Sequence, residues 1–457
     1  MNGQRSLLQR RWFRSEEQSE SKSSEVVVWV VAVPRHTPWR EKFCAPAAPH
    51  PANVSYKAVI PSFFELIMVF LTVLPRVGAR VTARIRSVSR TNSTSSDAIV
   101  DLRSDTVTKP TREMLECALS APIGDDVMGE DPTVTELEEY AAGMFGKEGG
   151  LFVPTGTMSN LCAILSHCHE RASEIIIGSS SHINLYEGGN AANLGGVHTK
   201  QIPEDPVSAT LDMDEVRSAY RHDNDDHYAK TALVCLENTH NILGGVALPK
   251  EYIDEMGRLA NNELGVPLHC DGARIMNAAI SLDTSPSELC AGADSISICL
   301  SKGLGAPLGS VLVGESEFIR LARRARKRCG GGMRQAGVVA SMGLYALQNN
   351  VQRLAEDHIR AKRLAHALGA MGFILPRGGQ VDTNLVFFAL PEDADLSVNE
   401  LCKRLDREYG VLIGGGYSRP GERNTNYIRA ATNMGVDDDG IERTLEGIER
   451  ILSGGGR

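Results

Sequence analysis

Six short apolar runs, separated by stretches of helical periodicity, follow residue 101 and constrain the fold of this 457-residue chain more than any other feature. Continuous apolar runs of this length, rich in Val, Ile and Leu, are typical of strands that are buried on both faces of a parallel sheet. Helices between several of them would cover those faces. The predicted strands comprise residues 151–154, 174–178, 231–238, 266–271, 295–300 and 310–314.

The helices expected between these strands have recognisable signals. Asp131 precedes Pro132, and a capping residue followed by proline in the first turn is typical of a helix start. Apolar residues then recur at helical spacing, as they do again over 161–168. The alternation of strand and helix predicts an α/β fold with a doubly wound, mostly parallel sheet. In such sheets, ligands collect at the carboxyl ends of the strands.

A second, smaller α+β domain is predicted towards the C-terminus. A long helical stretch over about 337–370 precedes strand-like segments at 383–390, 411–415 and 427–432. We therefore expect three parts, which are a leader over 1–97, a large domain over 98–340 and a small domain over 341–457.

The leader differs in composition from the rest of the chain. It carries more Lys and Arg than Asp and Glu, and its apolar run at 63–74 is shorter than the roughly 20 residues of a membrane span. Residues 68–96 contain five arginines and no acid, which is typical of a mitochondrial transit peptide. We hypothesise that Met68 is the working start and that the protein is mitochondrial. A disordered basic tail on a cytoplasmic protein is the alternative.

Net charge and cysteine usage limit the classes of partner. The formal net charge of -9 argues against nucleic acid, whose phosphates attract basic surfaces, and favours a small-molecule substrate. The 10 cysteines include no Cys-x-x-Cys pair, so no metal site is expected. No membrane contact is expected either.

Lys302 is the candidate nucleophile. It follows the apolar run 295–300 and precedes the glycine-rich stretch GLGAPLGS. A lysine that forms a Schiff base must lie in a dry pocket, where the neutral amine is favoured. Taken alone, this position is weak evidence, because most lysines at strand ends are solvated surface residues.

Asp271 in LHCDGAR ends another apolar run. A pyridine ring withdraws electrons strongly only when its nitrogen is protonated, and a buried carboxylate beside that nitrogen keeps the proton there. A lone Asp at a strand end more often caps the following turn.

The segment PTGTMSN follows a predicted strand and opens a helix. Gly156 allows the backbone to approach a phosphate, Thr157 adds a hydroxyl, and the helix N-terminus supplies free amides. By itself the segment is an ordinary glycine-containing helix entry.

His182 in SHINLYEGG lies beyond the predicted strand 174–178. An imidazole there can stack on a cofactor ring and carry a proton near neutral pH. A core histidine with a satisfied hydrogen bond is the alternative for this residue taken alone.

Together these segments resemble the threonine aldolases, which are pyridoxal 5'-phosphate enzymes of the aspartate-aminotransferase-like fold (fold type I). The resemblance covers residue 101 nearly to the C-terminus. It is carried by DLRSDTVTKPT, IGDDVMGEDPTVTELE, FVPTGTMSN, SHINLYEGG, LENTHN, HCDGARI, CLSKGLGAPLGS and GGGMRQAG.

The resemblance implies a role for each matching residue. Lys302 would bind the cofactor covalently, Asp271 would contact its ring nitrogen, and His182 would stack on the ring. His240 would lie near the substrate's hydroxyl. The phosphate would be held by Gly156 and Thr157. The substrate carboxylate would be held by Ser104, Arg274 and Arg429, with Arg274 also close to the cofactor.

Arg334 matches a residue that, in that family, reaches the phosphate of a neighbouring subunit. The resemblance therefore implies a homo-oligomer, a dimer or tetramer, whose sites are completed across an interface. Arg323, Arg324 and Arg326 precede it in a basic helical stretch, and we interpret those three as a solvated face.

One position departs from the family pattern. Many relatives have a histidine soon after the carboxylate-binding arginine, whereas this chain has Asn433 in RAATN. The preference for the side chain at the β carbon is therefore open.

The implied reaction is retro-aldol cleavage of the Cα–Cβ bond of L-threonine or L-allo-threonine, which yields glycine and acetaldehyde. His182 or His240, directly or through water, would remove the proton of the β-hydroxyl. A β-eliminating lyase, which releases ammonia, and an aldolase for aryl serines are the nearest alternatives. A scaffold that retains the fold without the activity is a non-enzymatic alternative.

Overall fold

The computed structural model describes residues 98–454 except 223 and 420–421, and the side chains of 422–425 are not described. The leader over 1–97, the transit peptide over 68–96 and the start at Met68 therefore lie outside the described residues. None of the described helices is both long and apolar enough to cross a membrane.

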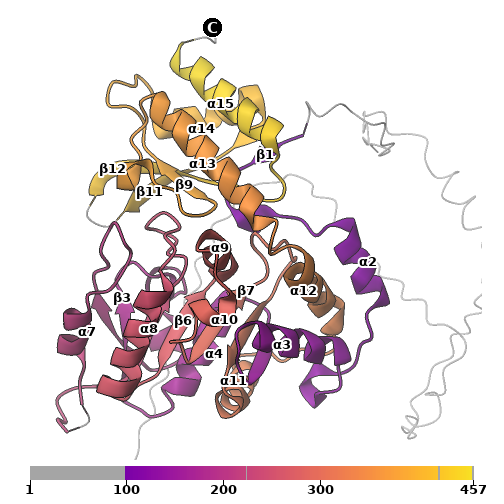
Figure 1. Ribbon diagram of the computed structural model, residues 1–457, viewed down its shortest axis with the longest axis vertical. Coiled ribbons are helices and arrows are strands. Elements are labelled where there is room, and N and C mark those ends of the chain that lie inside the picture. Colours follow the sequence, from indigo (N-terminus) through magenta and orange to yellow (C-terminus); the bar gives the residue numbers. More distant parts are fainter. Residues whose placement is uncertain (1–97, 223, 420–421, 455–457) are drawn as a thin grey trace, which may run out of the picture. The chain divides into compact units, whose positions relative to one another are not determined.

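A seven-stranded sheet organises the larger part of the chain, and six of its strands run in the same direction (Figure 1). The remaining strand, second in the sheet order, runs antiparallel to both of its neighbours. The mostly parallel sheet is thereby confirmed. In order across the sheet, the strands are β2 (Gly149–Val153), β8 (Ser310–Gly314), β7 (Ser295–Cys299), β6 (Leu268–Gly272), β5 (Lys230–Glu237), β3 (Ser173–Gly178) and β4 (His198–Ile202).

All six apolar runs form strands of this sheet, and β4 is the one strand of it that the sequence analysis missed. Its sequence HTKQI contains one large apolar residue, Ile202, because β4 lies at the sheet edge and is largely open to solvent. Hydrophobic runs therefore identified the strands that are buried on both faces and failed at the polar edge.

Helices pack against this sheet, and their starts follow from local side chains. Asp131 accepts a hydrogen bond from the Val134 amide, with Pro132 in the first turn, as the sequence predicts. Thr155 caps α4 in the same way through the Met158 amide. The helices of this part are α2 (Arg112–Ser120), α3 (Pro132–Met144), α4 (Gly156–His167), α5 (His182–Leu185), α6 (Asn190–Asn193), α7 (Met213–Ala219), α8 (Lys250–Arg258), α9 (Ile275–Ser281), α10 (Pro286–Leu289) and α11 (Ser316–Arg328).

The long helical stretch expected over about 337–370 consists of two helices, α12 (Gly337–Asn349) and α13 (Leu354–Ala370). The chain leaves the first helix at Asn350, whose buried side-chain amide donates to the carbonyl of Leu304. That bond ties the break to the loop that follows Lys302. Helix α12 lies in the core of the large sheet, whereas α13 supplies the second core from Ala361 onward.

A separate small sheet lies after α13 in the sequence, and helix α13 contributes to the core on which this sheet packs (Figure 1). Strands β11 (Gly414–Arg419), β12 (Glu422–Ala431) and β9 (Leu385–Phe388) are antiparallel, and α14 (Val398–Arg404) and α15 (Asp438–Leu452) accompany them. The start of the described chain joins this part, because β1 (Val100–Asp101) pairs with β10 (Val411–Leu412). Residues just after 101 are thus held next to the C-terminal strands.

The interpretation of the basic helix α11 as a solvated face is wrong for one of its three arginines. Arg324 is exposed and Arg323 is partly exposed, but Arg326 is only 2% exposed. Arg326 pairs with Asp126 at 2.8 Å and donates to the Phe152 carbonyl at 2.6 Å. It lies seven residues after the buried Ile319 and therefore on the same, inward-facing side of the helix.

Candidate active site

The carboxyl ends of β6 and β7 bring Asp271 and Lys302 to one edge of the large sheet. The two strands are parallel neighbours, with Asp271 opposite Ser297, and Lys302 follows the end of β7 by three residues. Asp271 is 2% exposed. The loop carrying Lys302 is anchored by Thr108, whose hydroxyl donates to the Lys302 carbonyl at 3.0 Å. The two residues on which the cofactor prediction depends therefore lie on the same side of the fold.

Asn160, in the second turn of α4, connects Asp271 to a second buried carboxylate. Its Nδ2 donates to Asp271 Oδ2 at 2.9 Å and to Glu187 Oε1 at 2.8 Å. Glu187 Oε1 also lies 3.0 Å from His182 Nδ1. Burial and the charge of Asp271 raise the pKa of Glu187, although His182 and Asn160 act against the rise. His182 is therefore linked to Asp271 through two intervening side chains.

The His182 side chain is 30% exposed, unlike the carboxylates behind it. Its backbone amide donates to Glu237 Oε2 at 2.6 Å, and the other oxygen of Glu237 accepts from the Asn241 amide at 2.8 Å. Glu237 thus fixes two neighbouring loops. Burial lowers the pKa of His182, but the bond to Glu187 and the charges of Asp271 and Glu237 together raise it by more, so the net shift is upward.

A candidate anion cradle lies at the start of α4, where the sequence analysis placed a phosphate site. The helix begins at Gly156, and Thr157 follows in its first turn. A Cβ at Gly156 would stand 3.6 Å from the hydroxyl of Ser310, which is buried and has no hydrogen-bond partner in the described part of the chain. Free helix amides beside an unsatisfied hydroxyl form a site suited to phosphate.

Arg274 is held by a residue that the sequence analysis did not single out. Its Nε and Nη2 both donate at 2.7 Å to the two carboxylate oxygens of Asp105, which is fully buried. Burial alone would raise the pKa of Asp105, but Arg274, the charge of Lys302 and the amide of Asn384 lower it to about 2. Asp105 therefore orients Arg274 and stays ionised, and Nη1 of the guanidinium lies outside this pair.

Arg429 and Ser104 reach the same region from opposite ends of the chain. Arg429 lies on β12 and donates to the Arg103 carbonyl at 3.1 Å and to Asn241 Oδ1 at 3.1 Å. Ser104 follows Arg103 directly and precedes the partner of Arg274. Burial and the nearby charge of Arg274 lower the pKa of Arg429. The three predicted carboxylate binders are thus brought together.

His240 is buried rather than open. Its Nε2 lies 3.1 Å from Glu204 Oε1, and the two side chains are 3% and 2% exposed. Burial lowers the pKa of His240, while Glu237, Glu204 and Asp271 raise it, with a net upward shift. Its Nδ1 is buried and has no partner in the described part of the chain.

Two further predicted positions are occupied by local interactions. The Arg334 side chain is 63% exposed and pairs with Asp125 at 2.6 Å, so within this chain it faces solvent. Asn433 is buried, donates to the carbonyls of Asp101 and Ala431, and accepts from the Gly435 amide. The residue that departs from the family pattern therefore organises backbone and offers no free polar group.

The sequence analysis missed the carboxylates and amide that hold the site together, namely Asp105, Asn160, Glu187, Glu204 and Glu237. All but Glu204 lie inside segments already noted for other residues, such as SHINLYEGG and PTGTMSN. Only their pairing across the fold distinguishes them from ordinary polar residues. Glu204, in an isolated polar stretch, carried no signal.

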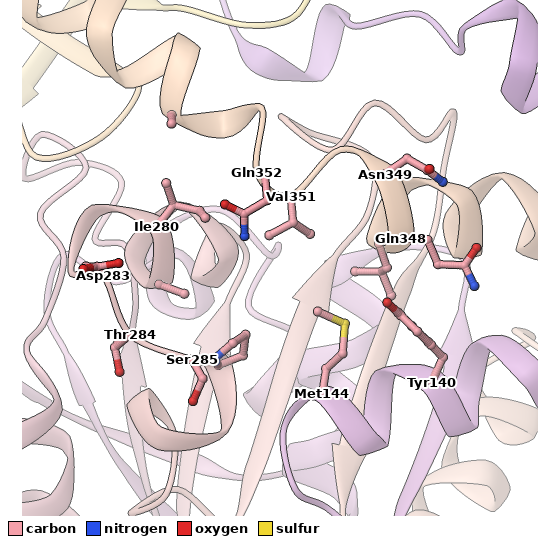
Figure 2. Close-up of a pocket in the computed structure, with 14 residues that line it drawn as sticks. Tyr140, Met144, Ile280, Asp283, Thr284, Ser285, Gln348, Asn349, Val351 and Gln352 are labelled. Carbon is pink, nitrogen blue, oxygen red and sulfur yellow. The ribbon is translucent and has the colours of Figure 1, made fainter.

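Two other candidate sites, a metal site at His182, Glu187 and Asp271 and the pocket drawn in Figure 2, are less suited to this chemistry. Ligand-type atoms of His182, Glu187 and Asp271 lie within 4.8 Å of one another, but the amide of Asn160 already donates to both carboxylates. The pocket in Figure 2, of 730 Å³, lies between α3 and the α9–α10 region. Its only charged lining residue is Asp283, so it lacks the groups that such chemistry needs.

Comparison with known proteins adds independent evidence. Residues 101–391 match the family model described as β-eliminating lyase. The chain is 44% identical over 354 residues to the probable low-specificity L-threonine aldolase 2 of Arabidopsis thaliana, covering 77% of this chain and 97% of that protein. It is 47% identical to the low-specificity L-threonine aldolase of Escherichia coli O157:H7, covering 67% and 89% respectively.

Solved structures agree at the level of the fold. The Leishmania major threonine aldolase has a TM-score of 0.65 at 19% identity, covering 77% of this chain and 99% of that one. A putative L-allo-threonine aldolase from Listeria monocytogenes has a TM-score of 0.63 at 20% identity, with 77% and 96% covered.

Proposed function

The chain belongs to the β-eliminating lyase family and, within it, to the low-specificity L-threonine aldolases; from that premise we propose that it cleaves L-threonine and L-allo-threonine to glycine and acetaldehyde. It is then a carbon–carbon lyase for β-hydroxy-α-amino acids, which consumes threonine and supplies glycine. The observation that carries the proposal is the edge of the large sheet, where Asp271, Lys302 and Arg274 converge.

Pyridoxal 5'-phosphate fits the residues at this edge. Asp271 is a buried carboxylate that accepts from Asn160 and the Ala273 amide and forms no ion pair with another described residue. Such a group favours a cationic partner, and a protonated pyridine nitrogen is one. The cradle at Gly156, with the unsatisfied hydroxyl of Ser310, suits the phosphate, and Lys302 supplies the amine. When bound, the cofactor would supply an electron-withdrawing ring, which is the chemistry that cleavage of the carbon–carbon bond needs.

The arginines of the site are suited to hold the substrate carboxylate. Arg274 is fixed by Asp105 through two hydrogen bonds, so its remaining nitrogen is presented in one orientation. Arg429 and Ser104 lie beside it. Fixing the carboxylate restricts rotation about the Cα bonds, and only one rotation aligns the scissile bond for cleavage.

His182 and His240 are the candidates to remove the proton of the β-hydroxyl. A general base must reach the proton and be able to release it. His182 is partly exposed at the edge, whereas His240 is buried against Glu204. Accessibility favours His182.

Arg334 supports assembly into an oligomer. Its exposed side chain lies outside the edge formed by its own chain, which is compatible with completing a neighbour's phosphate site. If so, mixing Arg334→Ala protein with Lys302→Ala protein will restore activity, because each hybrid pair contains one intact site. Two proteins that stay inactive after mixing would exclude the shared site.

The basic segment 68–96 supports a mitochondrial location. N-terminal sequencing of the native protein is expected to find a mature start shortly before residue 101. A mature start near Met1 would exclude it.

Product analysis tests the function. Purified protein with L-threonine or L-allo-threonine is expected to release equal amounts of glycine and acetaldehyde and no ammonia. Release of ammonia with a 2-oxo acid would instead identify a β-eliminating lyase. Activity confined to aryl serines would restrict the substrate class.

A further inference from the structure

Hydrogen bonds behind Asp271 form one continuous chain whose direction can be deduced. The Asn160 amide donates its two protons to the carboxylates of Glu187 and Asp271, so its Oδ1 must accept. His269 Nε2 lies 3.1 Å from Asn160 Oδ1. Burial lowers the pKa of His269 to about 4, so this histidine is neutral and donates from Nε2. The orientation of Asn160 is therefore determined by its surroundings.

The rest of the chain follows by the same logic. His269 Nδ1 must accept, and the Ser295 hydroxyl lies 2.9 Å away to donate to it. Ser295 Oγ in turn accepts from His167 Nε2 at 2.8 Å. Burial, followed by the charges of His269 and His169, lowers the pKa of His167 to about 3, so it too is neutral. Every donor points towards the two carboxylates, which suits their negative charge.

Glu187 ends this series of hydrogen bonds on the side that faces His182. Its Oε1 already accepts from Asn160, and the contact with His182 Nδ1 needs one proton between nitrogen and oxygen. Its Oε2 is buried and has no partner in the described part of the chain, so the carboxylate's charge is balanced chiefly through His182 and Asn160. That arrangement favours the proton on Nδ1 and leaves the Nε2 lone pair free.

We propose that Glu187 is the positioning residue for His182, holding its proton on Nδ1 so that Nε2 accepts the proton of the substrate's β-hydroxyl. The inference rests on the proposed aldolase function. In the step, the O–H bond breaks and an N–H bond forms at Nε2. The electron pair left on oxygen becomes the second bond of the aldehyde carbonyl, and the pair of the broken Cα–Cβ bond goes to the electron sink that the bound cofactor supplies.

Glu187 also stabilises the imidazolium that this transfer creates, because its carboxylate touches Nδ1. The titratable groups that face His182 are Glu187, Asp271 and Glu237, together with Tyr186, whose ring centroid is 5.6 Å away. All three carboxylates hold a proton on the imidazole more firmly. Of the three, only Glu187 touches the ring nitrogen, which makes its effect separable from theirs.

The variant Glu187→Gln tests the proposal, because it keeps the size of the side chain and removes the charge. The acid limb of the pH profile of kcat/KM for L-threonine is expected to move to lower pH by about one unit, since His182 loses a proton-stabilising neighbour. The same variant is expected to lower kcat by about 10²-fold, a typical share for one acid–base group. The Kd for pyridoxal 5'-phosphate is expected to change by less than about threefold.

Glu138→Gln is the matched control. Glu138 is also a buried glutamate whose pKa is raised by burial, but it pairs with Arg323 on α11. We expect it to leave the acid limb where it is in the wild type. An acid limb that stays in place in Glu187→Gln, or moves equally in both variants, would overturn the proposal.

Nitrogen NMR of the apo-protein gives a readout that does not depend on activity. With ¹⁵N-histidine, the wild-type signal of His182, assigned by its loss in His182→Gln, is expected to show the proton on Nδ1. A proton on Nε2 would overturn the proposal even if threonine is cleaved. Failure of the wild type to cleave threonine would instead contradict the proposed function.

Discussion

Two histidines pair with buried glutamates at the same edge of the sheet, and they differ chiefly in access to solvent. His182 contacts Glu187 at 3.0 Å with 30% of its side chain exposed, whereas His240 contacts Glu204 at 3.1 Å with 3% exposed. In both, neighbouring carboxylates raise the pKa of the imidazole. A histidine–glutamate pair of this kind can therefore either transfer a proton or hold the site together. Which of the two it does depends on whether the histidine is accessible to the substrate.

Glu204 illustrates the architectural case. Its carboxylate accepts from the Ser180 amide and the Ser179 hydroxyl as well as contacting His240. These serines lead directly from β3 to His182. The buried His240–Glu204 pair thus fixes the loop that carries the more exposed His182.

Of the substitutions at the two histidine–glutamate pairs, His182→Ala is expected to have the largest effect on catalysis. We expect kcat to fall by about 10²–10⁴-fold, because the general base is removed, while the free energy of unfolding changes by only about 1 kcal/mol. Steady-state kinetics and urea unfolding of the same preparations measure both. A variant that unfolds easily yet retains kcat would reverse the assignment of the two histidines.

The change Glu204→Gln should act mainly on stability. It leaves His240 buried without its charged partner, and breaking such a pair typically costs about 3 kcal/mol of unfolding free energy. Urea unfolding measures this. Glu263→Gln, which removes an exposed ion pair with Arg217, is the control and should cause no measurable change. Equal stability of the two variants would mean that the His240–Glu204 pair does not stabilise the fold.

The stability difference between wild type and Glu204→Gln should depend on pH. The pKa of Glu204 is lowered from 4.5 by its bonds to His240 and the Ser180 amide, which outweigh its burial, and that of His240 is raised from 6.5. The pair's contribution is then fully present between pH 4.5 and 6.5. It is lost as pH falls through the folded pKa of Glu204 or rises through that of His240, by at most about 1.4 kcal/mol per pH unit. A difference that stays constant from pH 4 to pH 9 would contradict the pairing.

The sequence predicted the parts of the molecule that depend on local pattern. Buried strands such as β7 appear as apolar runs, and the start of α3 is encoded by Asp131 and Pro132. The edge strand β4 and the buried Arg326 escaped prediction, because exposure and ion pairing depend on what packs against them. The charge of the residues themselves shows neither the exposure of a strand nor the burial of an arginine.

The site divides in the same way. Lys302, Asp271 and His182 were predicted from their places at strand ends and from a family resemblance. Asp105 and Glu187 were not. Although His182 is only five positions from Glu187, the Asn160 amide that holds the Glu187 carboxylate is 27 positions away, and Arg274 is 169 positions from Asp105. Long-range pairing of this kind has no signature in a single sequence.

Covalent labelling tests the central claim most directly. Reduction of the purified holoenzyme with borohydride, followed by peptide mass mapping, should fix the pyridoxyl group on the peptide that contains Lys302 and on no other lysine. Lys302→Ala should lose both the label and the release of glycine from threonine. A label on a different lysine, or glycine released at the wild-type rate by the variant, would contradict the account.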